Sequence, residues 1–384
     1  MRGLLVPGRR GRQIARMDEQ HLDYRAAGVD NVGEIDALQA LTDRVRRTFS
    51  FAGNPGQPGA VYLDLGYFAN VIEIGGGMGI AVSTDGVGTK LLVAEMLEKY
   101  DTVGIDCVAM NVNDILCVGA RPITLLDYIA VERTDPHVLG AIADGLLAGA
   151  EESRVSIGGG ELAQVAEMIR GVRPGSGFDI VATAVGLVPL DQVIVGEGLS
   201  DGDAIIGLAS TGVHSNGLTL ARKALFDAAR YAPDAYVDKL GRSVGEELLE
   251  PTRIYVRPVL DLLAAVDEVK ALAHITGNGF LNLLRVKSNV GFEITDLPPR
   301  QPIFHLIQES GKVEEAEMFR VYNMGVGFCV VTTADAADRA LEVLHAAGAP
   351  DAAIIGQVRA DRPGEIVLQD PRLVGTEEGG FRSV

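Results

Sequence analysis

The stretch Ser83-Thr84-Asp85-Gly86-Val87-Gly88-Thr89-Lys90 joins an apolar segment, Ile80–Val82, to a segment with helical spacing, Leu91–Tyr100. Its small residues let backbone N–H groups approach an anion, while Lys90 adds a positive charge and Asp85 a carboxylate. These groups are suited to a phosphate held with a metal ion. The stretch is not a Walker loop, because the four-residue spacer before a Gly-Lys pair is absent. Alone, it fits an ordinary strand-to-helix turn equally well.

Further acidic and amide residues stand at the ends of other apolar segments. Asn113 and Asp114 follow about twenty-five residues later, and Glu161 comes directly after Gly158–Gly160. Singly, each fits a helix cap or a turn. Together with Asp85, these side chains favour a site where Mg²⁺ bridges nucleotide phosphates.

The second half contains a similar junction. The apolar segment before Ser210 runs into the polar turn Ser210–Gly217 and then into a helical pattern, an arrangement that can hold a phosphate or polar substrate. Within this turn, His214 is predicted to contact a ligand. His274–Phe280 and Arg320–Gly327 also place polar groups beside glycine turns. No nucleophile elbow, zinc-type spacing or dinucleotide fingerprint accompanies them.

Composition narrows the class of protein. The chain has 384 residues, 47% hydrophobic and 22% charged, enough for two domains with substantial cores. Its net charge of −18 argues against nonspecific binding to nucleic acid or acidic membranes. No apolar run reaches the roughly 18 residues of a membrane span. Three cysteines in apolar surroundings favour reduced thiols and a cytoplasmic location.

The N-terminal residues differ from the rest. The first sixteen include five arginines and only a short apolar patch, Leu4–Pro7, which is too short for a secretory signal. We expect a disordered basic tail over residues 1–20, and translation from Met17 is an alternative.

Apolar segments alternate with helical patterns along the remaining chain, which predicts α/β or α+β domains. We expect two domains, residues 21–190 and 191–384. The predicted strands are 60–65, 70–74, 79–83, 125–131, 155–157, 178–188, 203–209, 270–276, 325–332 and 352–359, and the predicted helices are 36–47, 89–100, 104–118, 136–152, 217–230 and 244–265. Residues 53–59 are predicted to be a mobile loop, and 158–160 a glycine turn.

In their order along the chain, these motifs resemble the aminoimidazole ribonucleotide synthetase (phosphoribosylformylglycinamidine cyclo-ligase) family. The resemblance covers about residues 22–360. The motifs that carry it are Ser83–Lys90, Gly104–Asp114, Gly158–Glu161, Gly212–Gly217, Glu250–Tyr255, His274–Gly277 and Asn323–Gly327.

The resemblance implies a two-domain fold in which the N-terminal sheet forms a barrel with a second subunit's sheet, beside a C-terminal α/β domain. It implies a homodimer that binds ATP between the domains, with Mg²⁺ and K⁺ as ions. The reaction would be ATP-dependent closure of formylglycinamidine ribonucleotide to aminoimidazole ribonucleotide in purine biosynthesis, after phosphorylation of the formyl oxygen.

Matched position by position, the resemblance also implies site residues. The metal ligands would be Asp85, Asp114 and Glu161, and the catalytic residues His214, Asp114 and Lys90, with His214 transferring protons. The ATP-binding residues would be Asp85, Gly86, Gly88, Thr89, Lys90, Asn113, Asp114, Gly159, Gly160 and Glu161. The substrate-binding residues would be His214, Ser215, Asn216, Thr276 and Gly277.

Several loops depart from the family pattern. Gly53–Gly59 contains two prolines in place of paired glycines, Arg46 replaces a lysine, and Leu162–Ala166 and Gly277–Gly279 also differ. An arginine fork is not equivalent to a lysine charge at a phosphate. A paralogue acting on a different amide, acid or phosphate is therefore an alternative. A non-catalytic dimeric scaffold is a third reading, which the three predicted buried carboxylates disfavour.

Overall fold

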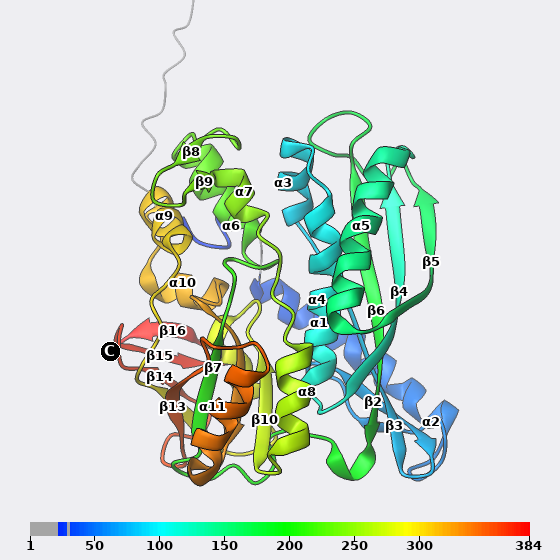
Figure 1. The fold of residues 1–384 in the computed structure, drawn as a ribbon, viewed down its shortest axis with the longest axis vertical. Coiled ribbons are helices and arrows are strands. Elements are labelled where there is room, and N and C mark those ends of the chain that lie inside the picture. The colour runs from blue at the N-terminus through cyan, green and yellow to red at the C-terminus, as the bar shows by residue number, and fades with distance from the viewer. Residues whose placement is uncertain (1–21, 29–30) are drawn as a thin grey trace, which may run out of the picture.

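The fold, seen in a computed structural model, is described for residues 22–28 and 31–384. The predicted tail over residues 1–20 and the alternative start at Met17 lie outside these residues. Two sheets lie side by side, one from each half of the chain, with helices α4 and α8 between them (Figure 1). The mixed α/β class expected from the alternating pattern is confirmed.

The first half builds a six-stranded sheet in the order β1-β2-β3-β6-β4-β5, in which only the β4–β5 pair is parallel. Burial along β6 alternates strictly, because one face packs against the helices that follow β3 and β4. The strands are β1 (Val61–Leu63), β2 (Asn70–Gly75), β3 (Met78–Gly86), β4 (Arg121–Val131), β5 (Ser156–Gln164) and β6 (Phe178–Pro189), and the helices are α1 (Asn31–Val45), α2 (Phe49–Ala52), α3 (Lys90–Leu97), α4 (Asp101–Leu116) and α5 (Pro136–Ser153).

The second half builds an eight-stranded sheet in the order β10-β12-β7-β13-β11-β14-β15-β16. Strand β12, the second strand from one edge, is wholly buried, and its residues are mostly β-branched or aromatic. The main strands are β7 (Ala204–Ala209), β10 (Val269–His274), β11 (Gly291–Ile294), β12 (Val326–Thr332), β13 (Ala353–Arg359), β14 (Ile366–Leu368), β15 (Leu373–Thr376) and β16 (Gly380–Ser383), with a small β8–β9 hairpin (Tyr236–Val237, Arg242–Ser243).

The helices of the second half surround this sheet. α6 continues directly into one π-helical turn, Lys223–Ala228, so the predicted helix 217–230 is present in two parts. The α-helices are α6 (Leu218–Arg222), α7 (Val244–Leu248), α8 (Val256–Ala265), α9 (Pro302–Gly311), α10 (Glu315–Val321) and α11 (Ala337–Ala346).

Two predicted elements are wrong. The glycine turn at 158–160 is instead part of strand β5. Gly160 is required there, because a Cβ would lie 2.4 Å from the Asp127 carboxylate of the neighbouring strand. The predicted helix 244–265 is two helices, α7 and α8, separated by residues 249–255. Pro251 lies between them, where a helix would lose a backbone donor.

The predicted loop at 53–59 joins α2 to β1 and is bonded to β2. Gly59 N donates to the Glu73 carbonyl at 2.7 Å, and Gly56 N donates to the Glu73 carboxylate at 3.1 Å. These bonds place the loop against the edge of the first sheet. None of the helices in the described part of the chain is long and apolar enough to cross a membrane.

Candidate active site

Polar residues from the two halves of the chain contact one another. Asp114, near the end of α4, accepts a hydrogen bond from His274 Nδ1 at 2.9 Å, and His274 is the last residue of β10. Asn216 Nδ2 lies beside Gly277, where an added Cβ would come within 3.5 Å of it. Thr89 and Thr219 face each other at 3.0 Å between their hydroxyl oxygens. The Asp114–His274 and Thr89–Thr219 contacts join the two halves of the chain, and we call this region the open cleft.

Asp85, on β3, lies close to Asp114. Its backbone N–H donates to Asn111 Oδ1 of α4 at 2.9 Å, and Ser83 Oγ contacts Asp114 Oδ2 at 3.4 Å. Burial, with the Asp114 charge as a second cause, raises the pKa of Asp85 to about 6. Two neighbouring carboxylates whose negative charges repel each other are suited to binding a divalent cation.

A cavity of about 450 Å³ adjoins these carboxylates and is lined largely by the first sheet. Its lining is mainly apolar, with Asp114, Asn70 and the Ser83–Thr84 pair as polar members. That combination is typical of small-molecule sites. The apolar lining residues are Phe49, Val61, Leu65, Phe68, Ile72 and Val82.

The structure does not place Glu161, Gly159 or Gly160 with these groups. In sheet register, Asp85 pairs with Ala182, then Asp127, then Gly160, so β5 lies three strands from β3, about 14 Å away. Glu161 pairs with the exposed Tyr128, on the opposite face from this row. Within one chain, the three predicted metal ligands are therefore not brought together, and that ligand set stays a prediction. No group of three or more acidic, His or Cys residues placed to hold a metal ion occurs among the described residues.

Lys90 is also not exposed to a ligand. Its side chain is completely buried, 2.8 Å from Asp106 Oδ2, and its ammonium donates to the Glu250 carbonyl at 2.6 Å. Burial lowers the pKa of Lys90, and the Asp106 charge opposes that change. The predicted phosphate-binding and catalytic role of Lys90 stays a prediction, although in this structure the Lys90 charge is paired with Asp106 inside the protein.

Asp106 also binds groups other than the Lys90 ammonium. It accepts hydrogen bonds from Thr252 N and Thr252 Oγ1, each at 2.7 Å, and from Ser215 Oγ at 3.2 Å. Asn113 completes the set: its amide donates to the Arg253 carbonyl at 2.9 Å and accepts from Tyr255 N at 3.0 Å. These bonds fasten residues 250–255 to α4. Ser215 and Asn113, predicted to bind substrate and ATP, are engaged in this buried network instead.

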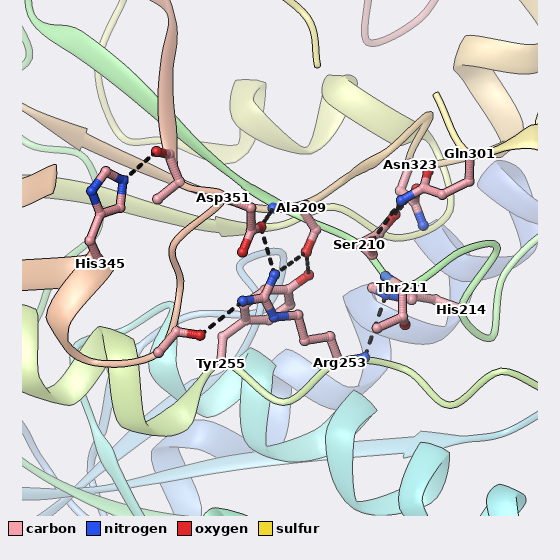
Figure 2. A network of polar contacts seen from close by, with 12 residues as sticks. Ala209, Ser210, Thr211, His214, Arg253, Tyr255, Gln301, Asn323, His345 and Asp351 are labelled. Carbon is pink, nitrogen blue, oxygen red and sulfur yellow. Dashed lines mark hydrogen bonds and ion pairs between the residues drawn. The ribbon is translucent and has the colours of Figure 1, made fainter. Parts of the chain in front are cut away.

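His214 lies beside Thr211 and the backbone of Arg253 (Figure 2). It is only 3% exposed, and its Nε2 accepts from Thr211 N at 3.2 Å and from Arg253 N at 3.5 Å. Burial lowers the pKa of His214 well below its usual value, with His274 as the next cause. In this structure the imidazole joins two backbone segments, and the predicted catalytic role of His214 stays a prediction.

His274 is the residue that the sequence reasoning missed. Its side chain is fully buried, Nδ1 is held by Asp114, and no hydrogen-bond partner is recorded for Nε2. The available signal was its position, at the end of a strand immediately before the glycine turn at Thr276–Gly277. Of the predicted residues, contacts place Asp85, Thr89, Asp114, Asn216 and Gly277 in this region. Gly86, Gly88 and Thr276 are neighbours of these residues along the chain.

Comparison with known proteins agrees with this architecture. Residues 66–188 match the family "AIR synthase related protein, N-terminal domain", and residues 200–369 match the corresponding C-terminal domain. Among solved structures, a HypE–HypF complex aligns with a TM-score of 0.57 and 20% identity, covering 83% of this chain and 92% of that one. Thiamine monophosphate kinase from Aquifex aeolicus aligns with a TM-score of 0.56 and 16% identity, covering 86% and 96%. Both show a shared fold.

Two sequence relatives are much more similar. The phosphoribosylformylglycinamidine cyclo-ligase of Methanothermobacter thermautotrophicus is 48% identical over 90% of this chain and 96% of its own length. That of Pyrococcus furiosus is 47% identical over 84% and 92%. This chain therefore belongs to the phosphoribosylformylglycinamidine cyclo-ligase family.

Proposed function

We infer that this protein closes the imidazole ring of aminoimidazole ribonucleotide from formylglycinamidine ribonucleotide at the expense of ATP, a step of purine biosynthesis. The observation that carries the inference is 48% identity over 90% of the chain to a relative of that name. The open cleft, where strand ends of both halves meet around Asp114, supplies a site for it.

The chemistry explains why ATP is needed. An amide oxygen is a poor leaving group. Transfer of the γ-phosphoryl group to the formyl oxygen, with release of ADP, replaces it with a good one. The ribosyl-bearing nitrogen then bonds to the formyl carbon, the C–O bond breaks, and phosphate leaves. Such a sequence depends mainly on positioning and on neutralising charge.

Asp85 and Asp114 fit a Mg²⁺ ion. Mg²⁺ in nucleotide sites takes one or two carboxylates plus substrate phosphates, so two neighbouring aspartates are sufficient. When bound, the ion neutralises phosphate charge. Gly86, Gly88 and Thr89 lie at the β3–α3 junction, where we place backbone contacts to ATP phosphates. A K⁺ ion is a further expectation from the family.

We assign the ribonucleotide to the other wall of the cleft. On this wall, Asn216 Nδ2 lies beside Gly277 of the Thr276–Gly277 turn, and these residues offer amide and hydroxyl groups to a phosphate. His274 Nδ1 donates to Asp114 and keeps that carboxylate oriented. Because the side chain of His274 is fully buried, we assign it this positioning role and no direct contact with substrate.

We propose that the working form is a homodimer. The face of the first sheet opposite α3, α4 and α5 exposes large apolar side chains, among them Ile74 (41%), Leu126 (47%) and Tyr128 (43%). Such a patch marks an interaction surface. Glu161, with Gly159 and Gly160 beside it on β5, is then available to the cleft of a second subunit and not to that of its own. We retain residues 21–190 and 191–384 as the two domains.

The cysteines among the described residues, Cys107, Cys117 and Cys329, are buried free thiols. Free thiols support a reducing, cytoplasmic location. The alternative of a paralogue with another substrate is not favoured by the relatives' names.

The test is an assay of the purified chain with formylglycinamidine ribonucleotide, ATP, Mg²⁺ and K⁺, following ADP and aminoimidazole ribonucleotide together. We expect one product per ADP, and loss of both with Asp114→Ala. ADP release without aminoimidazole ribonucleotide would overturn the proposed substrate while leaving the nucleotide site in place.

A further inference from the structure

A second cavity, of about 320 Å³, lies between the two halves and shares no lining residue with the cavity at Asp114. The start of β4 and the end of α5 form one wall, and the N-terminal part of α8 forms the other. A neighbouring hollow of about 380 Å³ shares Glu152, Arg154 and Arg257 with it. The lining residues are Arg121, Pro122, Glu152, Ser153, Arg154, Val256, Arg257, Leu260 and Asp261.

Three arginines line this cavity in a chain whose net charge is −18. Within residues 22–28 and 31–384, no hydrogen bond or ion pair is recorded for the side chains of Arg121 and Arg154. Arg257 makes only a long contact, 3.8 Å, with Asp261. Guanidinium groups that line one hollow repel one another, and an anion bound between them removes that repulsion. Their planar donors match the oxygens of a phosphate.

Ser153 is an independent sign of a ligand. It lines the cavity, its residue is only 2% exposed, and its Oγ has no hydrogen-bond partner. A buried hydroxyl without a partner is costly, so it is expected where something else supplies an acceptor. The N-terminus of α8 opens at the same place, because Tyr255 gives it no side-chain cap. That end of a helix favours negative charge.

The remaining lining indicates what accompanies the anion. Glu152 and Asp261 present carboxylates, which accept hydrogen bonds from hydroxyl groups, and burial raises the pKa of Glu152 against the influence of Arg253. Pro122, Val256 and Leu260 add apolar surface. We propose that this cavity is a second ligand site, which binds a small phosphate monoester carrying hydroxyl groups, such as a sugar phosphate, between the two halves of the protein.

The position of the site connects it to the open cleft. Residues 250–255 lead directly into α8, and Asn113 holds both the Arg253 carbonyl and Tyr255 N. Asp114, the next residue along α4, reaches into the open cleft. A ligand that bridges α5 and α8 therefore favours this spacing of the two halves. If ATP favours a different spacing, each ligand changes the affinity of the other by the same factor.

Isothermal titration calorimetry on the full-length protein tests the site, with ribose 5-phosphate as probe and with inorganic phosphate and ribose as reference compounds. Because the open cleft also takes phosphate esters, the titrations are done in Asp114→Ala and wild-type protein alike. We expect ribose 5-phosphate to bind both proteins, more tightly than phosphate, and ribose to bind most weakly.

Three variants locate the binding. Arg154→Ala is expected to weaken it about tenfold or more, since a charge-assisted hydrogen bond is lost, and Ser153→Ala about threefold to tenfold. Arg339→Ala removes an exposed arginine of the second half that lies outside the cavity, and serves as the matched control with unchanged affinity. If Arg154→Ala unfolds, Arg121→Ala provides the same comparison at an exposed side chain.

Equal affinity in wild type, Arg154→Ala, Arg121→Ala and Ser153→Ala would overturn the proposal, as would the absence of millimolar binding or ribose binding as tightly as its phosphate. The titration requires no turnover. Its failure is therefore separate from any failure of the proposed cyclo-ligase reaction.

Discussion

Helix α4 contributes to two polar regions that look alike in sequence and differ in the structure. Toward its C-terminal end, Asp114 is partly exposed in the open cleft, beside Asp85 and His274. Two turns earlier, Asp106 is fully buried with Lys90 and binds residues 250–255 through the backbone N–H of Thr252. In the first region, the like charges of Asp85 and Asp114 are not neutralised. In the second, the opposite charges of Asp106 and Lys90 neutralise each other. An uncompensated pair is suited to a ligand, whereas a compensated one is suited to holding the two halves together.

The largest effect is expected from breaking the buried pair. Asp106→Ala leaves the Lys90 ammonium buried without its partner and removes the acceptor for Thr252. We expect a loss of about 3–5 kcal/mol in the free energy of unfolding, measured by urea denaturation. Asp101→Ala, which breaks an exposed pair with Lys99, is the matched control and should cost about 0–1 kcal/mol. Equal costs would contradict the contrast between the regions.

A substitution in the open cleft should lower activity rather than stability. Asp114→Ala is expected to lower kcat/KM by about 10²–10³-fold, or about 3–4 kcal/mol of transition-state stabilisation, because a group that neutralises charge is lost. Its melting temperature should fall much less than that of Asp106→Ala. Steady-state product formation and thermal melting, measured on the same preparations, check this pair of outcomes. A variant with normal turnover would remove Asp114 from the site.

The effect of the Asp85 charge on folding stability can be tested by varying the pH. Its pKa rises from 3.8 to about 6 on folding, so ionised Asp85 opposes folding above pH 6, by at most about 3 kcal/mol. That opposition fades as pH falls from 6 toward 4. Asp85→Asn should therefore stabilise the Mg²⁺-free protein at pH 7.5 and have little effect near pH 4. A stability difference independent of pH would show that the carboxylate is not strained by its surroundings.

The smallest effect is expected at His214. Its φ of 61° lies in the left-handed region, which Asn tolerates, so His214→Asn tests the imidazole with little backbone strain. Loss of the two acceptor contacts should cost about 1 kcal/mol of stability. We expect kcat to change less than threefold and its pH profile to keep its shape. A large loss of kcat with an altered pH profile would restore the catalytic role that the sequence suggested.

The sequence predicted the α/β class, most strands and the Asp85–Asp114 neighbourhood, because strand ends with glycine turns carry local signals. It did not predict that Glu161 lies far from Asp85 and Asp114. That distance depends on the strand order β3-β6-β4-β5, in which β6 and β4 separate β3 from β5. Nor could it separate Lys90 and His214 from ligand-binding residues. Their burial is decided by residues 250–255, more than thirty positions away from either.

The helices α9, α10 and α11 were also missed. α11 has no side-chain cap at either end, and its apolar residues alternate with charged ones on a short element. Its structure is stabilised by packing against α8 and β7 rather than by local signals. Tertiary contacts therefore determine both these helices and the buried polar network, whereas the open cleft follows largely from local sequence.

Calorimetric titration of Mg²⁺-ATP is the most direct test of the division between the two regions. The double variant Lys90→Met/Asp106→Leu replaces the buried pair by apolar side chains, and Asp114→Ala removes one carboxylate of the open cleft. The account predicts that the folded double variant binds Mg²⁺-ATP with nearly wild-type affinity and that Asp114→Ala loses most of it. Loss of binding in the double variant, with binding retained in Asp114→Ala, would contradict it.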